Sequence, residues 1–137
     1  MTYMSLKDKY TELSTLPPLK ESQEVQKYTD AETNFGYDNK HDILQDLYDE
    51  IDELKEELDI HETKNNTQRI FEEFGDVLFV LGNLANRYNI DSAEALKYSI
   101  KEFERRMLYC EQHYNGNMKN APKETMIKLW KEAKKNK

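Results

Sequence analysis

Apolar residues recur at spacings of three and four along much of the chain, which is the period of an amphipathic α-helix. One stripe of this kind predicts a helix over about 41–61, and its members are Leu44, Leu47, Ile51, Leu54 and Leu58. The next segment, about 67–88, is apolar over most of its surface, so we expect this helix in the middle of a bundle. Asn66 or Thr67 is a plausible N-cap for it.

Weaker patterns predict four further helices, at about 5–14, 19–32, 92–114 and 122–135. The proline pair Pro17-Pro18 and Asn/Gly-rich turns separate them. The expected core stripe of the helix over 92–114 is Leu96, Ile100, Phe103, Met107 and Cys110. We therefore predict an all-α, four-helix-bundle-like protein with additional short N-terminal helices, in a single domain over 1–137, with residues 1–15 as a loosely ordered arm.

The composition supports this fold class and narrows the function. Hydrophobic residues make up 37% of the chain and charged residues 34%, with only four glycines and three prolines, which disfavours a β-sandwich. The single Cys110 excludes an internal disulfide and favours a buried, inert thiol in a reducing compartment. The lack of a signal-like or membrane-spanning stretch predicts a soluble, cytoplasmic protein. The net charge of −7 argues against nucleic-acid binding.

Charge is distributed unevenly along the sequence. Residues 38–62 contain eleven acids and two lysines, whereas residues 118–137 contain seven lysines and two acids. The two segments are either solvated surface or the metal-binding and phosphate-binding sides of one site.

Two pairs of acids carry the chemical hypothesis: Glu50-x-x-Glu53 and Glu73-x-x-Asp76. Three-residue spacing places the members of each pair on one face of a helix. Glu73, Asp76 and Asn83 fall on one side of the apolar helix, where charges are costly unless they are paired or bind a metal. The alternative is a solvated acidic face, which is the simpler interpretation for Glu56, Glu57, Asp59 and Glu62.

The types of ligand available favour one kind of metal. Carboxylates without thiolate or histidine favour Mg²⁺, or Mn²⁺ as a substitute. A di-iron bundle needs Glu-x-x-His motifs, and none of His41, His61 and His113 follows a glutamate at that spacing. Mg²⁺ held by a few carboxylates leaves coordination positions for phosphate oxygens, so we expect a phosphate-bearing substrate.

The segments Asp49-Glu50-Ile51-Asp52-Glu53 and Glu72-Glu73-Phe74-Gly75-Asp76 resemble the EExxE…ExxD signature of MazG-type nucleoside triphosphate pyrophosphohydrolases. The likeness extends to three further segments in the same order. These are Gly36-Tyr37-Asp38, the stretch from Ala95-Leu96 to Phe103-Glu104-Arg105-Arg106, and Leu129-Trp130-Lys131-Glu132-Ala133-Lys134. The resemblance covers about 16–134, almost the whole chain.

The resemblance implies an all-α dimer or higher homo-oligomer that hydrolyses an NTP or dNTP to the monophosphate and pyrophosphate with Mg²⁺. By position, the implied metal ligands are Glu50, Glu53, Glu73 and Asp76. Asp49 would be a further ligand or would orient the attacking water, which makes Asp49, Glu50 and Glu53 the candidate catalytic residues. The candidate substrate contacts are Arg106, Trp130, Lys101 and Asn83, although Trp130 is at a spacing that also suits a core residue.

Three positions depart from the family pattern. Asp46 replaces a frequent lysine, and Ile100 and Glu102 replace a frequent asparagine and lysine. Three interpretations of these departures are open. Lys101, Arg105 or the lysine-rich tail takes over the basic contacts to substrate, or the substrate specificity has shifted. In the third, the protein retains metal binding but has lost much of its activity. The alternatives are an all-α dUTPase or dCTPase relative with narrow substrate choice, or a non-catalytic module that binds nucleotide or protein. Phosphoribosyl-ATP pyrophosphatase shares the helical layout, but the Trp130 ending argues against it.

Overall fold

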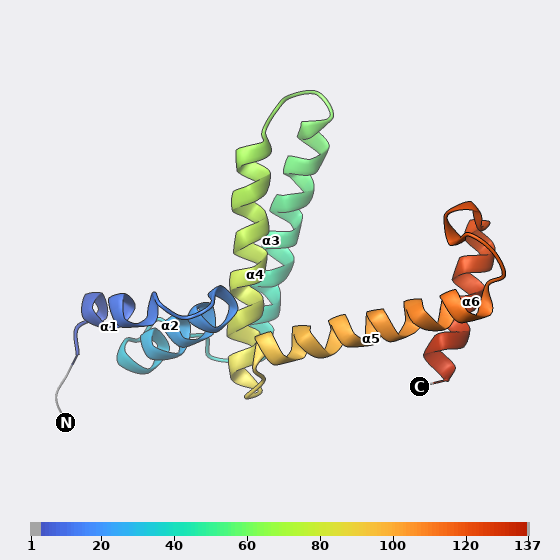
Figure 1. The fold of residues 1–137 in the computed structure, drawn as a ribbon. Helices are drawn as coiled ribbons and strands as arrows, with labels where there is room; N and C mark the ends of the chain where they lie inside the picture. Colours follow the sequence, from blue (N-terminus) through green and yellow to red (C-terminus); the bar gives the residue numbers. More distant parts are fainter. Residues whose placement is uncertain (1–3, 137) are drawn as a thin grey trace. The chain divides into compact units, whose positions relative to one another are not determined.

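A computed structural model describes residues 4–136 of the chain, and these residues form helices and no strands (Figure 1). The elements are α1 (Leu6–Leu13), α2 (Pro18–Glu32), α3 (Lys40–His61), α4 (Thr67–Arg87), α5 (Ser92–His113), the short 3-10 helix η1 (Met118–Asn120) and α6 (Lys123–Lys135). The all-α prediction is confirmed, and each predicted helix begins and ends within one residue of the observed one. Within 4–136 no helix has the length and apolar character that crossing a membrane requires.

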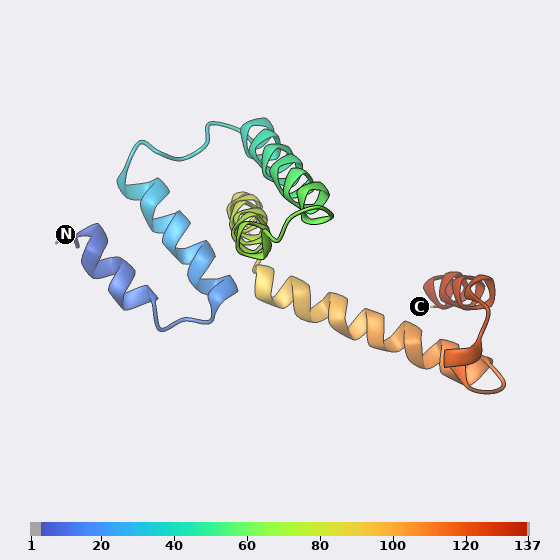
Figure 2. The same ribbon diagram turned by 90° about the horizontal axis from the view of Figure 1, so that it is seen from above.

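The described chain divides into two compact units, residues 4–93 and residues 94–136. In the first unit α3 and α4 lie side by side as an antiparallel hairpin, α2 packs against α4, and α1 packs against α2 (Figures 1 and 2). Residues 6–13 of the expected N-terminal arm form α1, whose Leu13 is buried, and residues 1–3 lie outside the described part. The assignment of 1–137 to a single domain stays a prediction.

Two buried glutamines join α2 to α4 and to the segment that follows it. Gln26 donates from Nε2 to the carbonyl oxygen of Phe79 at 2.8 Å. Gln23 donates to the Asn86 side chain at 3.0 Å, and its Oε1 accepts from the backbone nitrogen and hydroxyl of Ser92. Because each amide satisfies several polar groups, these contacts fix the position of α2 along α4.

The helices of the first unit expose more apolar surface than the sequence predicts. Phe71, Phe74, Leu78 and Leu81 of α4 are 41–72% exposed, and only Val80, Gly82 and Asn83 of this helix are buried. The expectation of a central, enclosed helix is therefore wrong for the single chain, because α2 and α3 cover only part of its circumference. The expected stripe on α3 is also partly exposed, with Ile51 and Leu58 about half exposed, and the buried residue of this helix is Ile43, which is outside the stripe.

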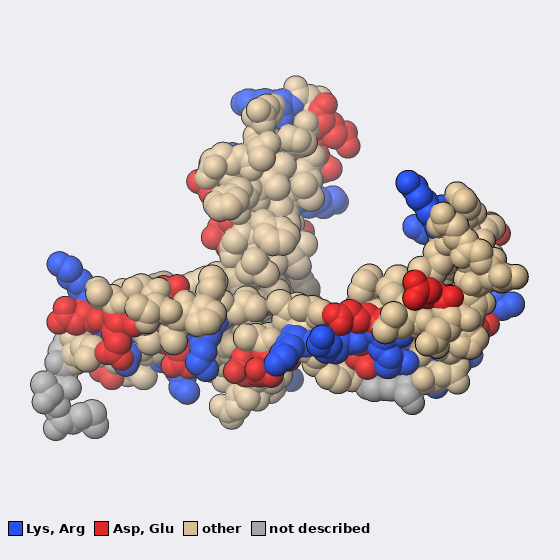
Figure 3. Space-filling model, viewed as in Figure 1, with Lys and Arg blue, Asp and Glu red and all other residues tan. Residues whose placement is uncertain are grey.

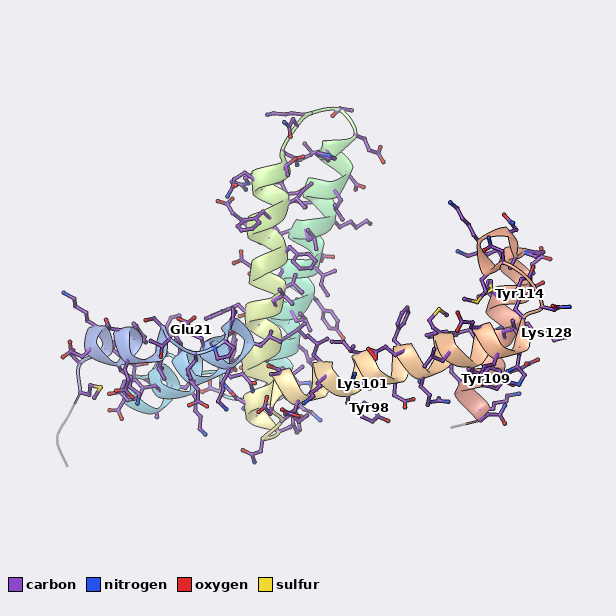
Figure 4. The ribbon with its side chains drawn as sticks, in the orientation of Figure 1. Glu21, Tyr98, Lys101, Tyr109, Tyr114 and Lys128 are labelled. Atoms are coloured by element: carbon purple, nitrogen blue, oxygen red, sulfur yellow. The ribbon has the colours of Figure 1, made fainter. Side chains whose placement is uncertain are left out.

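The second unit is built from α5, η1 and α6. Cys110, Leu129 and Ala133 are buried, as expected for the cysteine, whereas Leu96, Ile100 and Phe103 of the predicted core stripe are about half exposed. Burial raises the pKa of the Cys110 thiol, which is consistent with an inert residue. Lysine and arginine side chains are mixed with acids along α5 (Figure 3). Tyr109 lies on the part of α5 that contacts α6, where its hydroxyl donates to Glu132 at 3.4 Å (Figure 4).

Candidate metal centre and phosphate-binding groups

The register of α3 against α4 is fixed at the closed end of their hairpin. The Asn66 side chain donates to the carbonyl oxygen of Glu57 at 2.8 Å and to its carboxylate at 2.6 Å, and its oxygen lies 2.9 Å from Nδ1 of His61. Arg69 adds an ion pair to Glu57 at 3.7 Å. Asn66 does occupy the N-cap position of α4, but its side chain binds α3 instead of the first turn of α4.

This register brings acids of the two helices together. One carboxylate oxygen from each of Glu50, Glu73 and Asp76 lies within 4.8 Å of the other two. Glu50 and Glu73 are half-buried, and the Oε2 atom of each is enclosed without a hydrogen-bond partner. Buried oxygens of this kind are costly unless a proton or a cation satisfies them.

The pKa values of this cluster reflect that cost. Burial raises the pKa of Glu50 to about 7, with added contributions from the charges of Glu53 and Asp76. Burial also raises the pKa of Glu73, and a hydrogen bond to Glu53 adds to it. Both shifts oppose ionisation, so positive charge among these carboxylates would reverse them. Such raised pKa values in a cluster of acids are typical of functional sites.

Glu53 and Asp49 differ from the three clustered acids. Glu53 is exposed, yet it is close enough to raise the pKa of both Glu50 and Glu73. Asp49 is also exposed and accepts a hydrogen bond from Gln45 at 2.9 Å, one turn earlier on α3. The structure thus brings together three of the four predicted ligands, with Glu53 beside them and Asp49 outside the cluster.

The acid that replaces a family lysine has a partner in the turn before α3. The hydroxyl of Tyr37 donates to Oδ2 of Asp46 at 2.6 Å. Burial raises the pKa of Tyr37, and Asp46 raises it further. Asp46 is therefore paired with the Gly36-Tyr37-Asp38 segment.

Asn83 lies at a pocket of about 270 Å³ that is lined by α1, α2, α4 and the turn before α3. Its Nδ2 donates to the Asp30 carboxylate at 3.2 Å, and Phe35, Tyr37 and Phe79 supply aromatic walls. The pocket follows the acid cluster along α4, because Phe79 is three residues and Asn83 seven residues after Asp76. At 1.5 Å per residue this corresponds to roughly 5–10 Å along the helix.

The other predicted contacts belong to the second unit. The guanidinium carbon of Arg106 lies 5.3 Å from the centre of the Trp130 ring, and Trp130 is 5.5 Å from Phe103. Lys101 is exposed and pairs with Glu104 at 3.3 Å (Figure 4). Trp130 is half-buried, so it is neither a closed core residue nor a freely exposed one.

Three residues that hold predicted site residues in place were not themselves predicted as site residues from the sequence. Asp30 and Tyr37 become site residues only because α2 and the following turn lie against α4 and α3. Glu102 stands out in the sequence as a departure from the family pattern, but its pairing with two arginines does not follow from that. The aromatic residue in Gly36-Tyr37-Asp38, next to a helix rich in acids, is the one sequence signal for this region.

Comparison with known proteins places this arrangement of acids in a family. The MazG nucleotide pyrophosphohydrolase domain matches residues 38–110, which contain both acidic pairs and Arg106 but not Trp130. The chain belongs to this family. Membership is consistent with the all-helical fold, and the matched residues span both compact units.

Three relatives illustrate the similarity. The nucleoside triphosphate pyrophosphohydrolase of Escherichia coli K12 is 29% identical over 123 residues, which are 88% of this chain and 46% of that protein. The nucleoside triphosphate pyrophosphohydrolase/pyrophosphatase MazG of Thermotoga maritima is 26% identical over 122 residues, 87% of this chain and 45% of that protein. The uncharacterized protein YabN of Bacillus subtilis is 42% identical over 65 residues, 45% of this chain and 13% of that protein. The chain spans about half the length of the first two relatives.

Proposed function

We propose that this protein hydrolyses nucleoside or deoxynucleoside triphosphates to the monophosphate and pyrophosphate. The observation that carries the proposal is the convergence of Glu50, Glu73 and Asp76 within 4.8 Å in a chain of the MazG family. Two relatives that it matches over most of its length are named as nucleoside triphosphate pyrophosphohydrolases.

The residues of the cluster fit a divalent cation. Glu50 and Glu73 each have an enclosed carboxylate oxygen without a hydrogen-bond partner, and all the donors are carboxylates. Oxygen-only donors suit Mg²⁺, with Mn²⁺ as a substitute. We propose that Glu50, Glu53, Glu73 and Asp76 hold the ion. When bound, it supplies positive charge that offsets the repulsion between a water nucleophile and the triphosphate.

The protein's acids also have a part in proton transfer. In the proposed reaction a water oxygen forms a bond to the α-phosphorus, and the bond from that phosphorus to the αβ-bridging oxygen breaks as pyrophosphate leaves. The water proton passes to a carboxylate, and Asp49, Glu50 and Glu53 are the candidates. Asp49 is exposed and held by Gln45, so it suits the role of orienting water better than that of a ligand.

Each compact unit contains candidate groups for binding substrate. Arg106 offers a planar guanidinium for phosphate oxygens, with Trp130 beneath it and Lys101 on the same helix. Asn83 belongs to the aromatic-walled pocket beyond Asp76, whose volume of about 270 Å³ suits a nucleoside. The distance along α4 from Asp76 to this pocket is comparable to that from the α-phosphate to the base of a nucleotide.

We further propose that the protein works as a homodimer or higher homo-oligomer. Phe71, Phe74, Leu78 and Leu81 form a continuous exposed apolar stripe on α4, and the α3–α4 hairpin shows a broad surface with few charges (Figure 3). Exposed apolar patches of this kind mark association sites. Sedimentation of the purified protein tests this, and a monomer at micromolar concentration would contradict it.

A panel of NTPs and dNTPs with Mg²⁺ tests the proposed activity, provided that the products are identified. We expect monophosphate and pyrophosphate in equal amounts. Release of orthophosphate, or no turnover of any nucleotide, would contradict the proposal. Near-exclusive use of dUTP or dCTP would instead support a narrow dUTPase or dCTPase-like enzyme, and the aromatic-walled pocket at Asn83 is then the candidate place for that selection. A shift in melting temperature with Mg²⁺ and nucleotide but no product would support a non-catalytic binding module.

A further inference from the structure

Two neighbouring arginines of α5 share the carboxylate of Glu102. Arg105 lies 3.3 Å from it through Nε and Oε1, and Arg106 lies 3.6 Å from it through Nη2 and Oε2. The Glu102 side chain is only 15% exposed, so these pairs are less screened than most surface ion pairs. The Glu102 carboxylate is therefore the shared ion-pair partner of Arg105 and Arg106, the two arginines considered for phosphate binding.

The donors of Arg105 are used by the fold. Its Nη2 donates to Oε2 of Glu102 at 3.3 Å and to the carbonyl oxygen of Ala133 at 3.1 Å. Its Nη1 donates to the carbonyl oxygen of Asn136 at 3.3 Å. These carbonyls lie at the C-terminal end of α6, where the last turn leaves acceptors without intrahelical partners. Arg105 thus joins α5 to α6.

Arg106 is held differently. One end of its guanidinium reaches Glu102, and the carbon of the group lies 5.3 Å from the centre of the Trp130 ring. Its Nε atom is enclosed and has no hydrogen-bond partner. The Arg106 side chain as a whole is about 25% exposed, so a guanidinium oriented by a carboxylate and an aromatic ring can still present its outer nitrogens to phosphate oxygens.

We propose that Glu102 is a positioning residue that holds the Arg106 guanidinium in place for a phosphate group, while Arg105 serves the packing of α6. This deepens the proposed function and rests on it. An arginine side chain fixed before binding loses less conformational entropy when phosphate arrives. The acid that replaces a basic family residue then supports phosphate binding through its neighbour.

Steady-state kinetics with the nucleotide that the wild type hydrolyses fastest tests this role. We expect Glu102→Ala to raise KM about three- to tenfold and to change kcat less than about twofold. Glu102→Gln keeps an acceptor for the arginines, so it should restore most of the loss. Glu111→Ala removes an exposed acid from the same helix and should leave both constants unchanged. In an Arg106→Ala background, Glu102→Ala should have no further effect on KM.

Several results would overturn the proposal. A lower KM in Glu102→Ala would mean that the carboxylate competes with phosphate. An equal rise in KM in the Arg106→Ala background would mean that Glu102 acts on the fold and not through Arg106. Circular dichroism checks folding. If Glu102→Ala is unfolded, Glu102→Gln carries the test: Arg106 should stay ordered and KM should rise less than about threefold, and a KM raised about tenfold with Arg106 still ordered would overturn the positioning role.

A second measurement separates this proposal from the proposed activity. Nuclear magnetic relaxation of the Arg106 Nε–H group, measured without nucleotide, should report an ordered side chain in the wild type and in Glu111→Ala. It should report a mobile one in Glu102→Ala. The same mobility in wild type and Glu102→Ala would overturn the positioning role. The two proposals can fail separately. If no nucleotide is hydrolysed, the proposed activity fails. The positioning role still holds if, in Glu102→Ala, the Arg106 side chain loses order and the protein binds inorganic tripolyphosphate more weakly than the wild type does.

Discussion

The hydroxyl of Tyr37 donates a 2.6 Å hydrogen bond to Oδ2 of Asp46, joining the turn before α3 to the second turn of that helix. This contact explains how an acid is accommodated where the family often has a lysine. It also places the aromatic ring at the wall of the pocket that contains Asn83. One pair thus links the start of the acidic helix to the proposed nucleoside pocket.

Tyr37→Phe should lower the free energy of unfolding by about 0.5–1 kcal/mol, because the bond is lost but Asp46 remains accessible to water. Since burial and Asp46 raise the pKa of Tyr37, it should ionise after the other tyrosines in an ultraviolet titration. Tyr37→Phe should therefore remove absorbance change only from the most alkaline part of the curve. A change in the early part of the curve would contradict the assignment.

The raised pKa of Glu50 predicts how stability depends on pH in the presence of a chelator. The folded protein holds a proton on Glu50 up to about pH 7, whereas the unfolded chain releases it near its ordinary value of 4.5. The contribution of Glu50 to the free energy of unfolding is therefore fully present below pH 4.5, and this contribution is lost as the pH rises to about 7. The raised pKa of Glu73 acts in the same direction.

Urea denaturation at pH 5, 6, 7 and 8 measures this effect. Glu50→Gln removes the titrating group, so its stability should fall less between pH 5 and 7 than that of the wild type. Glu56→Gln changes an exposed acid on the same helix and serves as the control. If the free energy of unfolding of the wild type rises over this range just as that of Glu50→Gln does, ionisation of Glu50 does not destabilise the folded protein.

The helix pattern of this sequence was predictable because it depends on local chemistry. The three-four spacing of apolar residues and the polar segments between them locate α3, and Asn39 caps it by accepting from two backbone nitrogens, at 2.9 and 3.1 Å. The meeting of Glu50 with Glu73 and Asp76 also follows from spacing, once two helices form a hairpin. The 3-10 helix Met118–Asn120 was missed, since three residues leave no periodic signal.

Side-chain partners across elements were not predictable in this way. Asn66 reads as an N-cap, but the approach of α3 offers its amide the oxygens of Glu57 instead. Arg105 and Arg106 are adjacent in the sequence, and only the return of α6 against α5 gives Arg105 the carbonyls of Ala133 and Asn136. The exposure of Phe71 likewise depends on which neighbours cover α4, which its own sequence does not encode.

Removal of one proposed metal ligand should abolish both cation binding and turnover. We expect Mg²⁺ at ten times its Kd to stabilise the wild type by about 1.4 kcal/mol, and to have little effect on Asp76→Asn. Turnover in Asp76→Asn and in Glu53→Gln should fall at least about a hundredfold, while the helical circular dichroism signal is retained. An equal Mg²⁺ shift in wild type and Asp76→Asn would place the ion elsewhere.

Two glycines of α4 give a matched test of the packing between α2 and α4. A Cβ at Gly75 would meet no atom within 4 Å, so Gly75→Ala should gain helix propensity and stabilise the protein by about 0.5–1 kcal/mol. A Cβ at Gly82 would lie 3.0 Å from the Ser22 hydroxyl and 3.3 Å from Nε2 of Gln26. Gln26 cannot move freely, because the same nitrogen donates to Phe79.

Gly82→Ala should therefore destabilise the protein by about 1–2 kcal/mol in spite of the same gain in propensity. Urea denaturation with a chelator present compares the two variants without any contribution from bound cation. Stabilisation by both substitutions would show that α2 yields at little cost, and that Gln26 does not fix its position on α4. Destabilisation by Gly75→Ala would instead reveal a close contact on the exposed side of α4, next to the acid cluster, as a second copy packed against that surface would produce.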